Sequence, residues 1–228
     1  MSCYLDPEAH LSWDALGPYI QPYVLGAPDE LVNHNARLAC IELCRRSGIL
    51  HDENRLDLQK GVSDYFLTTL CDYEVVRVFQ IDMFGRYTIR PSLTKPSRPS
   101  WNGGFGGNVS TAASFYCGPY GFWLENVDVL KLTMQLQQDY PQGLRVEFIV
   151  QPKQDGCTLD NYLYEHFAEG IAAGAISRLM LLKNTAWYDP ALARQFAMQF
   201  QKEIARARTT SDMNFTSGAV MMQAERWI

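Results

Sequence analysis

Two apolar stripes in the last third of the chain constrain its fold more than any other feature. In residues 160–182, apolar side chains recur at every fourth position and so share one face of a helix. They are Leu163, Phe167, Ile171, Ala175 and Leu179. The second stripe follows Asp189-Pro190, an N-cap residue and a first-turn proline, and consists of Leu192, Phe196, Phe200 and Ile204. The short link between the stripes predicts an antiparallel helical hairpin.

Gly170 and Gly174 lie on the strip of helix surface beside the first stripe. In a helix interior each glycine lowers the stability of the helix by roughly 1 kcal/mol relative to alanine. We therefore expect that the tertiary structure requires glycine at these positions. Close approach of a second helix is one such requirement, because glycine has no side chain to separate the two backbones. We therefore predict that the final helix packs tightly against these two positions.

A third helix is predicted near the N-terminus. It begins at Pro28, followed by two acids that suit the positive end of a helix, and runs to about Arg46 before Ser47-Gly48 ends it. Packed on the hairpin, this helix would close a three-helix unit. Before it, two prolines are expected to break residues 1–26 into short helical pieces.

Between these helices the sequence favours strands. Residues 74–82 are β-rich, and Phe84-Gly85 predicts the turn of a hairpin with residues 86–90. Residues 127–136 and 144–151 alternate with period two, with a turn expected at 140–143. Closely spaced strands with tight turns predict an antiparallel meander or small sandwich, inserted between the first and second helices of the unit.

The predicted fold class is therefore α+β: a helical bundle with an inserted antiparallel β domain and an extended tail. The predicted boundaries are an N-terminal helical segment at 1–60, the β domain at 61–157, the helical hairpin at 158–208, and a C-terminal arm at 209–228.

The C-terminal arm (residues 209–228) lacks a sustained helical period but is rich in apolar residues. A tail that merely frays is usually polar, so this arm is expected to bind a partner surface. The alternative is that it packs on its own domain. The residues expected to make the partner contact are Phe215, Met221, Met222, Trp227 and Ile228.

No pattern of reactive residues points to catalysis or metal binding. The cysteines include no CxxC pair, and Cys40 and Cys44, one helical turn apart, have no further ligand at zinc-like spacing. We expect them to be buried thiols. The histidines match no catalytic motif, and an acid pair such as Glu125 and Asp128 has no supporting nucleophile or base. The protein is expected to be no enzyme and to need no cofactor or metal.

Charge and hydropathy exclude further classes. The chain has 228 residues and a net charge of −5, with no basic domain, which argues against a general nucleic-acid binder. Residues 1–60 carry nine acidic and five basic side chains. No apolar run of 18 residues is present, so no membrane span is expected. The first ten residues are neither basic nor apolar, unlike a secretion signal.

A glycine-rich stretch at 103–107 lacks the order of a phosphate-binding loop and predicts a surface loop. Its neighbours Trp101 and Phe105 are expected either to contact another protein or to fold back over a core. Tyr120 follows the same stretch. One alternative function for the β domain is a module that binds carbohydrate or protein through such aromatic residues.

The order of these pieces, and several local strings, resemble the head-to-tail adaptor (connector) proteins of tailed bacteriophages. The strings that carry the resemblance are Tyr23–Pro28 leading to His34–Cys44, Leu58–Tyr65 followed by Tyr73–Val78, Leu163–Ala175, Trp187–Pro190 and Phe200–Arg208. They are similar to the first helix, the lead into the sheet and the closing helical hairpin of that family.

This resemblance implies a structural protein of the virion neck, assembled in the host cytoplasm. Such adaptors form a dodecameric ring beneath the portal, provide a platform for tail or nozzle proteins, and let double-stranded DNA pass. The family has no catalytic residues. We expect the C-terminal arm to bind the portal, and Trp101, Phe105 and Tyr120 to contact a neighbouring copy or a tail component. An acidic ring lining would let DNA slide without binding.

Overall fold

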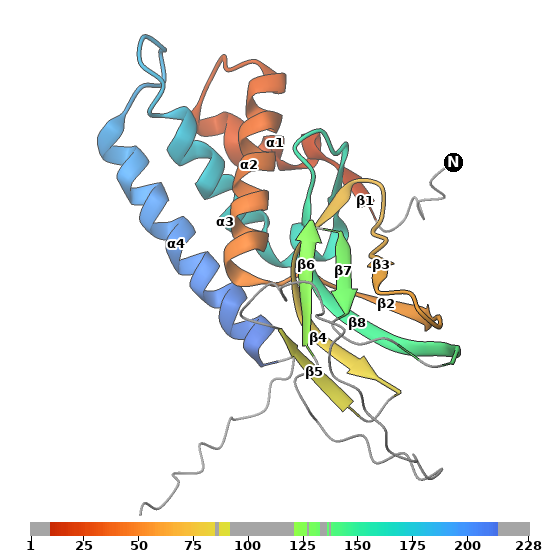
Figure 1. The fold of residues 1–228 in the computed structure, drawn as a ribbon. Coiled ribbons are helices and arrows are strands. Elements are labelled where there is room, and N and C mark those ends of the chain that lie inside the picture. Colours follow the sequence, from red (N-terminus) through yellow and green to blue (C-terminus); the bar gives the residue numbers. More distant parts are fainter. Residues whose placement is uncertain are drawn as a thin grey trace, which may run out of the picture. The chain divides into compact units, whose positions relative to one another are not determined.

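The computed structural model describes residues 10–84, 87–91, 121–126, 128–132, 136 and 138–213. Its helices and strands confirm the α+β class (Figure 1). The chain divides into two compact units. The first contains residues 1–51, 69–76 and 149–228, and the second contains residues 52–68 and 77–148. Within the described residues, no helix is both long enough and apolar enough to cross a membrane.

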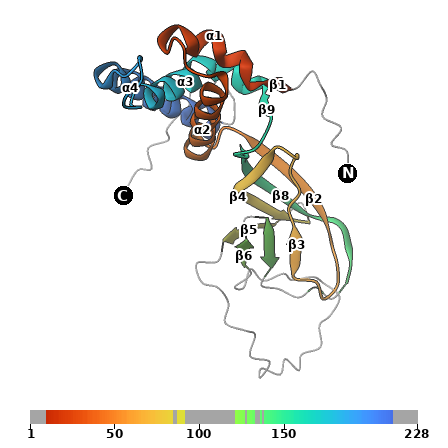
Figure 2. The same ribbon diagram turned by 90° about the horizontal axis from the view of Figure 1, so that it is seen from above.

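The first unit is helical. Its elements are the 3₁₀-helix η1 (Trp13–Leu16), α1 (Gly17–Ile20), the 3₁₀-helix η2 (Gln21–Tyr23), α2 (Asp29–Ser47), α3 (Asn161–Leu179) and α4 (Pro190–Asp212). Helix α3 packs along α4, and α2 packs against both of them, so the three long helices lie side by side (Figures 1 and 2). One continuous apolar core, from Trp13 to Ala207, runs between them.

The sequence sets the helix ends locally. The carboxylate of Asp160 accepts hydrogen bonds from the first backbone N–H groups of α3, and Asp189 caps α4 in the same way. Gly48 ends α2 in the left-handed conformation, with φ of 67°, which glycine adopts without strain. The predicted starts of these helices agree with the structure within about one residue, whereas the predicted ends of α3 and α4 differ from it by about three and four residues, the usual uncertainty of such boundaries.

The two glycines of α3 are points of close helix approach, as predicted. A Cβ at Gly170 would lie 2.8 Å from Cβ of Glu203 on α4. A Cβ at Gly174 would lie 2.8 Å from Cβ of Ala39 on α2 and 3.0 Å from the ring of Phe200 on α4. Gly174 therefore meets both partner helices at once.

Charged side chains join the same helices at the edge of the core. Arg206 of α4 forms an ion pair with Glu203 at 2.7 Å and lies over the ring of Phe167, 4.8 Å from its centroid. Arg178 of α3 forms an ion pair with Glu42 of α2 at 2.6 Å. Burial lowers the pKa of the Arg178 guanidinium, and Glu42 acts in the opposite direction.

The strands form two sheets. They are β1 (His10–Ser12), β2 (His51–Leu58), β3 (Asp64–Phe66), β4 (Tyr73–Met83), β5 (Tyr87–Pro91), β6 (Gly121–Asn126), β7 (Val129–Leu132), β8 (Tyr140–Pro152) and β9 (Thr158–Asp160). The small sheet pairs β1 with β9, and the large sheet has the order β2-β8-β4-β5-β6-β7-β3.

The pairing of β5 with β6 corrects the expected antiparallel meander. The predicted hairpin of β4 and β5 is present, with Ile81 opposite Ile89. Strands β5 and β6, however, are parallel, with Arg90 opposite Gly121. A parallel pair needs a long crossover, and residues 92–120 connect these two strands. Strand patterns alone do not reveal the direction in which such a connection returns.

Strand β2 starts at His51, ten residues before the expected start of the β domain at 61. Its sequence, HDENRLDL, is too polar to show an apolar alternation. Ion pairs stabilise it instead: Glu53 accepts from Arg145 of β8 at 2.8 Å and from Arg55 at 2.7 Å. Both arginines hold the pKa of Glu53 below its usual range, Arg55 more strongly.

The turn expected at 140–143 is instead the start of β8. Gln142 takes a positive φ of 49° there, and its N–H donates to the carboxylate of Asp57 at 2.6 Å. The strand expected over 127–136 is assigned only at Val129–Leu132.

Helix α4 continues to Asp212, four residues beyond the boundary predicted for the C-terminal arm. Thr209 and Thr210 donate their hydroxyls to the carbonyls of Ala205 and Arg206, one turn earlier in the helix. Ser211 is buried and donates to the Gly48 carbonyl at 2.8 Å. Residues 209–212 therefore belong to the helical unit.

Replacing Gly174 with alanine is expected to lower the free energy of unfolding. Overpacking costs roughly 1–3 kcal/mol, and a gain in helix propensity of about 1 kcal/mol offsets only part of it. Urea denaturation measures the difference. Gly17→Ala is the matched control, because a Cβ there would meet nothing closer than 3.8 Å. A Gly174→Ala protein more stable than the parent would contradict the close packing.

Candidate functional site

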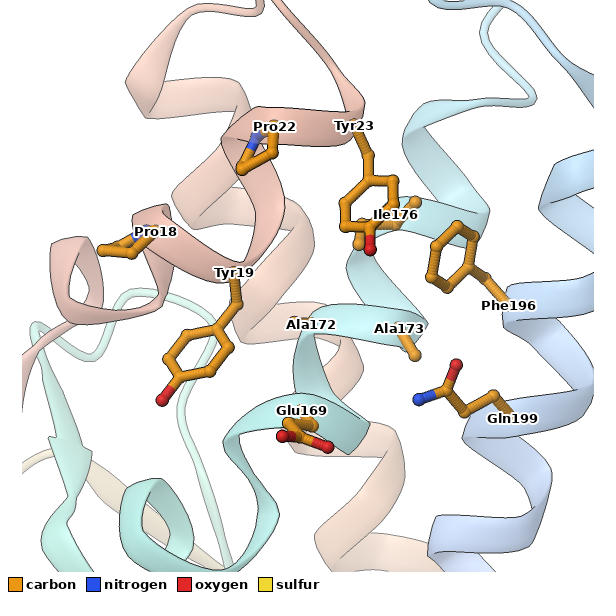
Figure 3. Close-up of a pocket in the computed structure, with 10 residues that line it drawn as sticks. All are labelled: Pro18, Tyr19, Pro22, Tyr23, Glu169, Ala172, Ala173, Ile176, Phe196 and Gln199. Atoms are coloured by element: carbon orange, nitrogen blue, oxygen red, sulfur yellow. The ribbon is translucent and has the colours of Figure 1, made fainter.

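The first unit carries a groove of about 430 Å³ where residues 18–23 cross α3 and α4 (Figure 3). Its aromatic walls are Tyr19, Tyr23 and Phe196. Ala172, Ala173 and Ile176 of α3 contribute to its lining. The volume lies within the roughly 300–1,000 Å³ typical of pockets that hold small ligands, so the groove is the candidate binding site of this unit.

Two prolines give the N-terminal wall of the groove its form. Pro18 lies in the first turn of α1, and Pro22 lies in η2; proline fixes φ and interrupts a regular helix. The buried Ile20 and Val24 anchor this segment to the core. Tyr19 and Tyr23 remain 39% and 48% exposed, so the segment presents two tyrosines beside the groove.

Both tyrosines make edge-to-face ring contacts with the long helices. The Tyr23 and Phe196 ring centroids are 4.9 Å apart at an interplanar angle of 75°. Tyr19 meets Tyr164 of α3 at 6.4 Å and 78°. Such pairs contribute about 0.5–1.5 kcal/mol beyond the area that they bury. The aromatic walls are therefore held in place before any ligand binds.

Two polar side chains, Glu169 and Gln199, complete the lining (Figure 3). Glu169 is exposed and forms no ion pair among the residues that the structure describes. The pKa of Tyr19 is raised, mainly by the neighbouring Tyr164 and also by the negative charge of Glu169. The groove thus suits an apolar or aromatic group that carries a hydrogen-bond donor or a positive charge.

The titratable side chains in the lining of the groove are those of Glu169, Tyr19 and Tyr23. The lining contains no cysteine, serine or histidine. Across the described residues, no three His, Cys, Asp or Glu side chains gather as a metal would require. Cys40 and Cys44 are fully buried, as predicted. The Cys44 hydrogen bond and burial raise the pKa of the Cys40 thiol.

Four further apolar residues are exposed near one end of the three helices. Leu25 precedes α2, and the α3–α4 connection contributes Leu181, Leu182 and Tyr188; these four residues are 38–77% exposed. The contact of Tyr23 with Phe196 brings the two segments to the same end of the unit. Exposed apolar surfaces of this kind are typical of protein contacts.

The residues predicted from the sequence as contact sites lie outside the described part of the chain. They are Trp101, Phe105 and Tyr120, together with Phe215, Met221, Met222, Trp227 and Ile228. Their roles stay predictions. Of the acid pair, Asp128 is exposed, whereas the side chain of Glu125 is outside the described set.

The groove is not predicted from the sequence, because the prolines of residues 1–26 indicate only an interrupted helix. The repeated Pro-Tyr pairs, Pro18-Tyr19 and Pro22-Tyr23, were the available signal: the tyrosines recur after four residues, which places them one helical turn apart. Nothing local, however, indicates that Phe196 packs against one of them.

Comparison with protein-family models and with curated proteins finds no match to this chain. The function is therefore proposed from its residues and geometry.

Thiol alkylation tests the buried cysteine pair. In the native protein at neutral pH, iodoacetamide is expected to modify Cys157, which is exposed, and to leave Cys40 and Cys44 unmodified. Burial and a raised pKa keep the less reactive thiol form at Cys40. Peptide mass spectrometry gives the extent at each site, and unfolding in urea should expose all three. Equal native labelling of Cys40 and Cys157 would contradict the described core.

A double-mutant cycle tests the aromatic wall. Tyr23→Ala and Phe196→Ala together are expected to show a coupling of about 0.5–1.5 kcal/mol in the free energy of unfolding, because their rings contact each other edge to face. Tyr23→Ala with Met198→Ala is the control pair and should be additive, since Met198 is 60% exposed and does not line the groove. A coupling of zero for the first pair would contradict the contact.

Proposed function

We propose that this chain is a head-to-tail adaptor, a structural protein of the neck of a tailed bacteriophage. Its copies would form a ring beneath the portal, a dodecamer as the sequence resemblance implies. The ring would provide the platform for tail or nozzle proteins and surround the DNA that passes through.

The observation that carries this proposal is the order of the elements. Of the three long helices, α2 comes first; strands β2 to β9 follow it, and α3 and α4 then pack on α2. The sequence strings that resemble adaptor proteins fall on these same elements: His34–Cys44 lies in α2, Leu163–Ala175 in α3, and Phe200–Arg208 in α4. The resemblance therefore concerns the segments that build the helical core.

The surfaces of the helical unit are compatible with an assembly subunit. The unit exposes apolar residues at Leu25, Leu181, Leu182 and Tyr188, and a ring subunit needs contact surfaces toward its neighbours and at its ends. We propose that this apolar end contacts another protein of the neck.

The charge of the chain is concentrated in the first unit. Residues 1–51, 69–76 and 149–228 contain 16 acidic and 11 basic residues, and the second unit contains nine of each. An acidic surface toward the channel would repel phosphate and let DNA slide. We place the DNA-facing surface of the proposed ring on the helical unit for this reason.

Co-assembly with the portal protein of the same phage tests the proposal. The full chain is expected to join portal rings and to comigrate with them in size-exclusion chromatography. Deletion of residues 214–228 should abolish this binding while circular dichroism shows a folded protein, because α4 ends at Asp212. Met198→Ala, which changes an exposed residue outside the groove, is the control and should still bind. A full chain that never joins the portal would refute the adaptor role; a deletion variant that binds normally would refute the role of the arm.

A further inference from the structure

We propose that the groove of the helical unit is a docking site for residues 214–228 of the same chain, with Trp227 as the side chain that enters it. The proposal goes beyond the adaptor role and does not depend on it. It rests on three properties of the groove: its aromatic walls, its polar lining and its distance from the end of α4.

The aromatic walls select the kind of side chain that binds. Tyr19, Tyr23 and Phe196 surround a space of about 430 Å³, and their rings already contact neighbours in edge-to-face geometry. A further flat ring can extend such an arrangement. Residues 214–228 contain two aromatic residues, Phe215 and Trp227. Phe215 lies only two residues beyond Met213, which is too short a link to reach the groove. Trp227 is therefore the aromatic residue that we place in the groove.

The polar lining matches the donor that tryptophan carries. A buried indole N–H needs an acceptor, and the carboxylate of Glu169 and the amide oxygen of Gln199 are both accessible in the groove. Arg226, the single basic residue of the 214–228 segment, can also reach an exposed carboxylate at the rim. Glu169 forms no ion pair within the described residues and is therefore open to it.

The chain is long enough to reach the groove. Phe196 lies 17 residues before Met213 on a continuous helix, a distance of about 26 Å at 1.5 Å per residue. The 13 residues from 214 to 226 span up to about 43 Å when extended. Gly218 provides a position where the direction of the chain can reverse. A tether of this length gives a high effective concentration, which favours docking within one molecule over docking between copies.

If the chain is an adaptor, docking in the groove would delay binding of the arm to the portal. Met221, Met222 and Trp227 would be held on their own subunit until a portal surface competes for them. Only this release by the portal depends on the adaptor role. Docking in the groove is measured on the free protein, so a failure of the adaptor proposal would not refute the docking proposal, and the reverse also holds.

Photocrosslinking of the full-length chain tests the inference. p-Benzoylphenylalanine replaces Gln199, which lines the groove, or in the control Met198, its exposed neighbour that does not. After irradiation at low micromolar concentration, gel mobility separates crosslinked monomers from dimers, and mass spectrometry locates the crosslink. We expect the Gln199 variant to crosslink within its own chain to residues 219–228, and the Met198 variant to do so at least about tenfold less.

A second substitution identifies the anchor. Trp227→Ala in the Gln199 crosslinking variant should remove most of the product, whereas Gln223→Ala should leave it unchanged. Crosslinks only between copies would assign the groove to a second molecule and overturn the proposal. The absence of crosslinks to residues 219–228, equal yields from Gln199 and Met198, or a product insensitive to Trp227→Ala would overturn it as well.

Discussion

The close contact of α3 with its two neighbours is the constraint on which the helical unit depends. Where Gly174 lacks a side chain, Ala39 of α2 and Phe200 of α4 reach the surface of α3. At Gly170, Glu203 lies over the helix and holds Arg206 against the ring of Phe167. Larger residues at these positions would separate the helices and open the core. Small residues on α3, including Ala173, also leave room for the groove.

The sequence could predict this helical unit because its determinants are local. Asp160 and Asp189 cap the helices that follow them, and the apolar stripes identify the faces that meet. Strand β2 was missed because its partner is remote: Glu53 pairs with Arg145, far along the chain. The parallel pairing of β5 and β6 could not be predicted, because no strand pattern specifies the direction in which the second strand runs.

The candidate site also could not be predicted from the sequence, because it depends on contacts between distant segments. Its walls come from segments far apart in the sequence, with Tyr23 against Phe196 and Glu169 nearby on α3 (Figure 3). Residue spacing could indicate the tyrosine pair but not its partner helix. The aromatic residues that the sequence did single out, among them Trp101 and Trp227, lie outside the described residues. The proposed docking places Trp227 in the groove, and the proposed portal role gives it a second binding surface.

We propose that copies of this chain form a ring in the neck of a phage particle. Cryo-electron microscopy of the neck in virions of the phage that encodes the chain tests it most directly. We expect a ring of identical subunits between portal and tail, into whose density the packed helices α2, α3 and α4 fit. A neck in which every ring is accounted for by other proteins would contradict it.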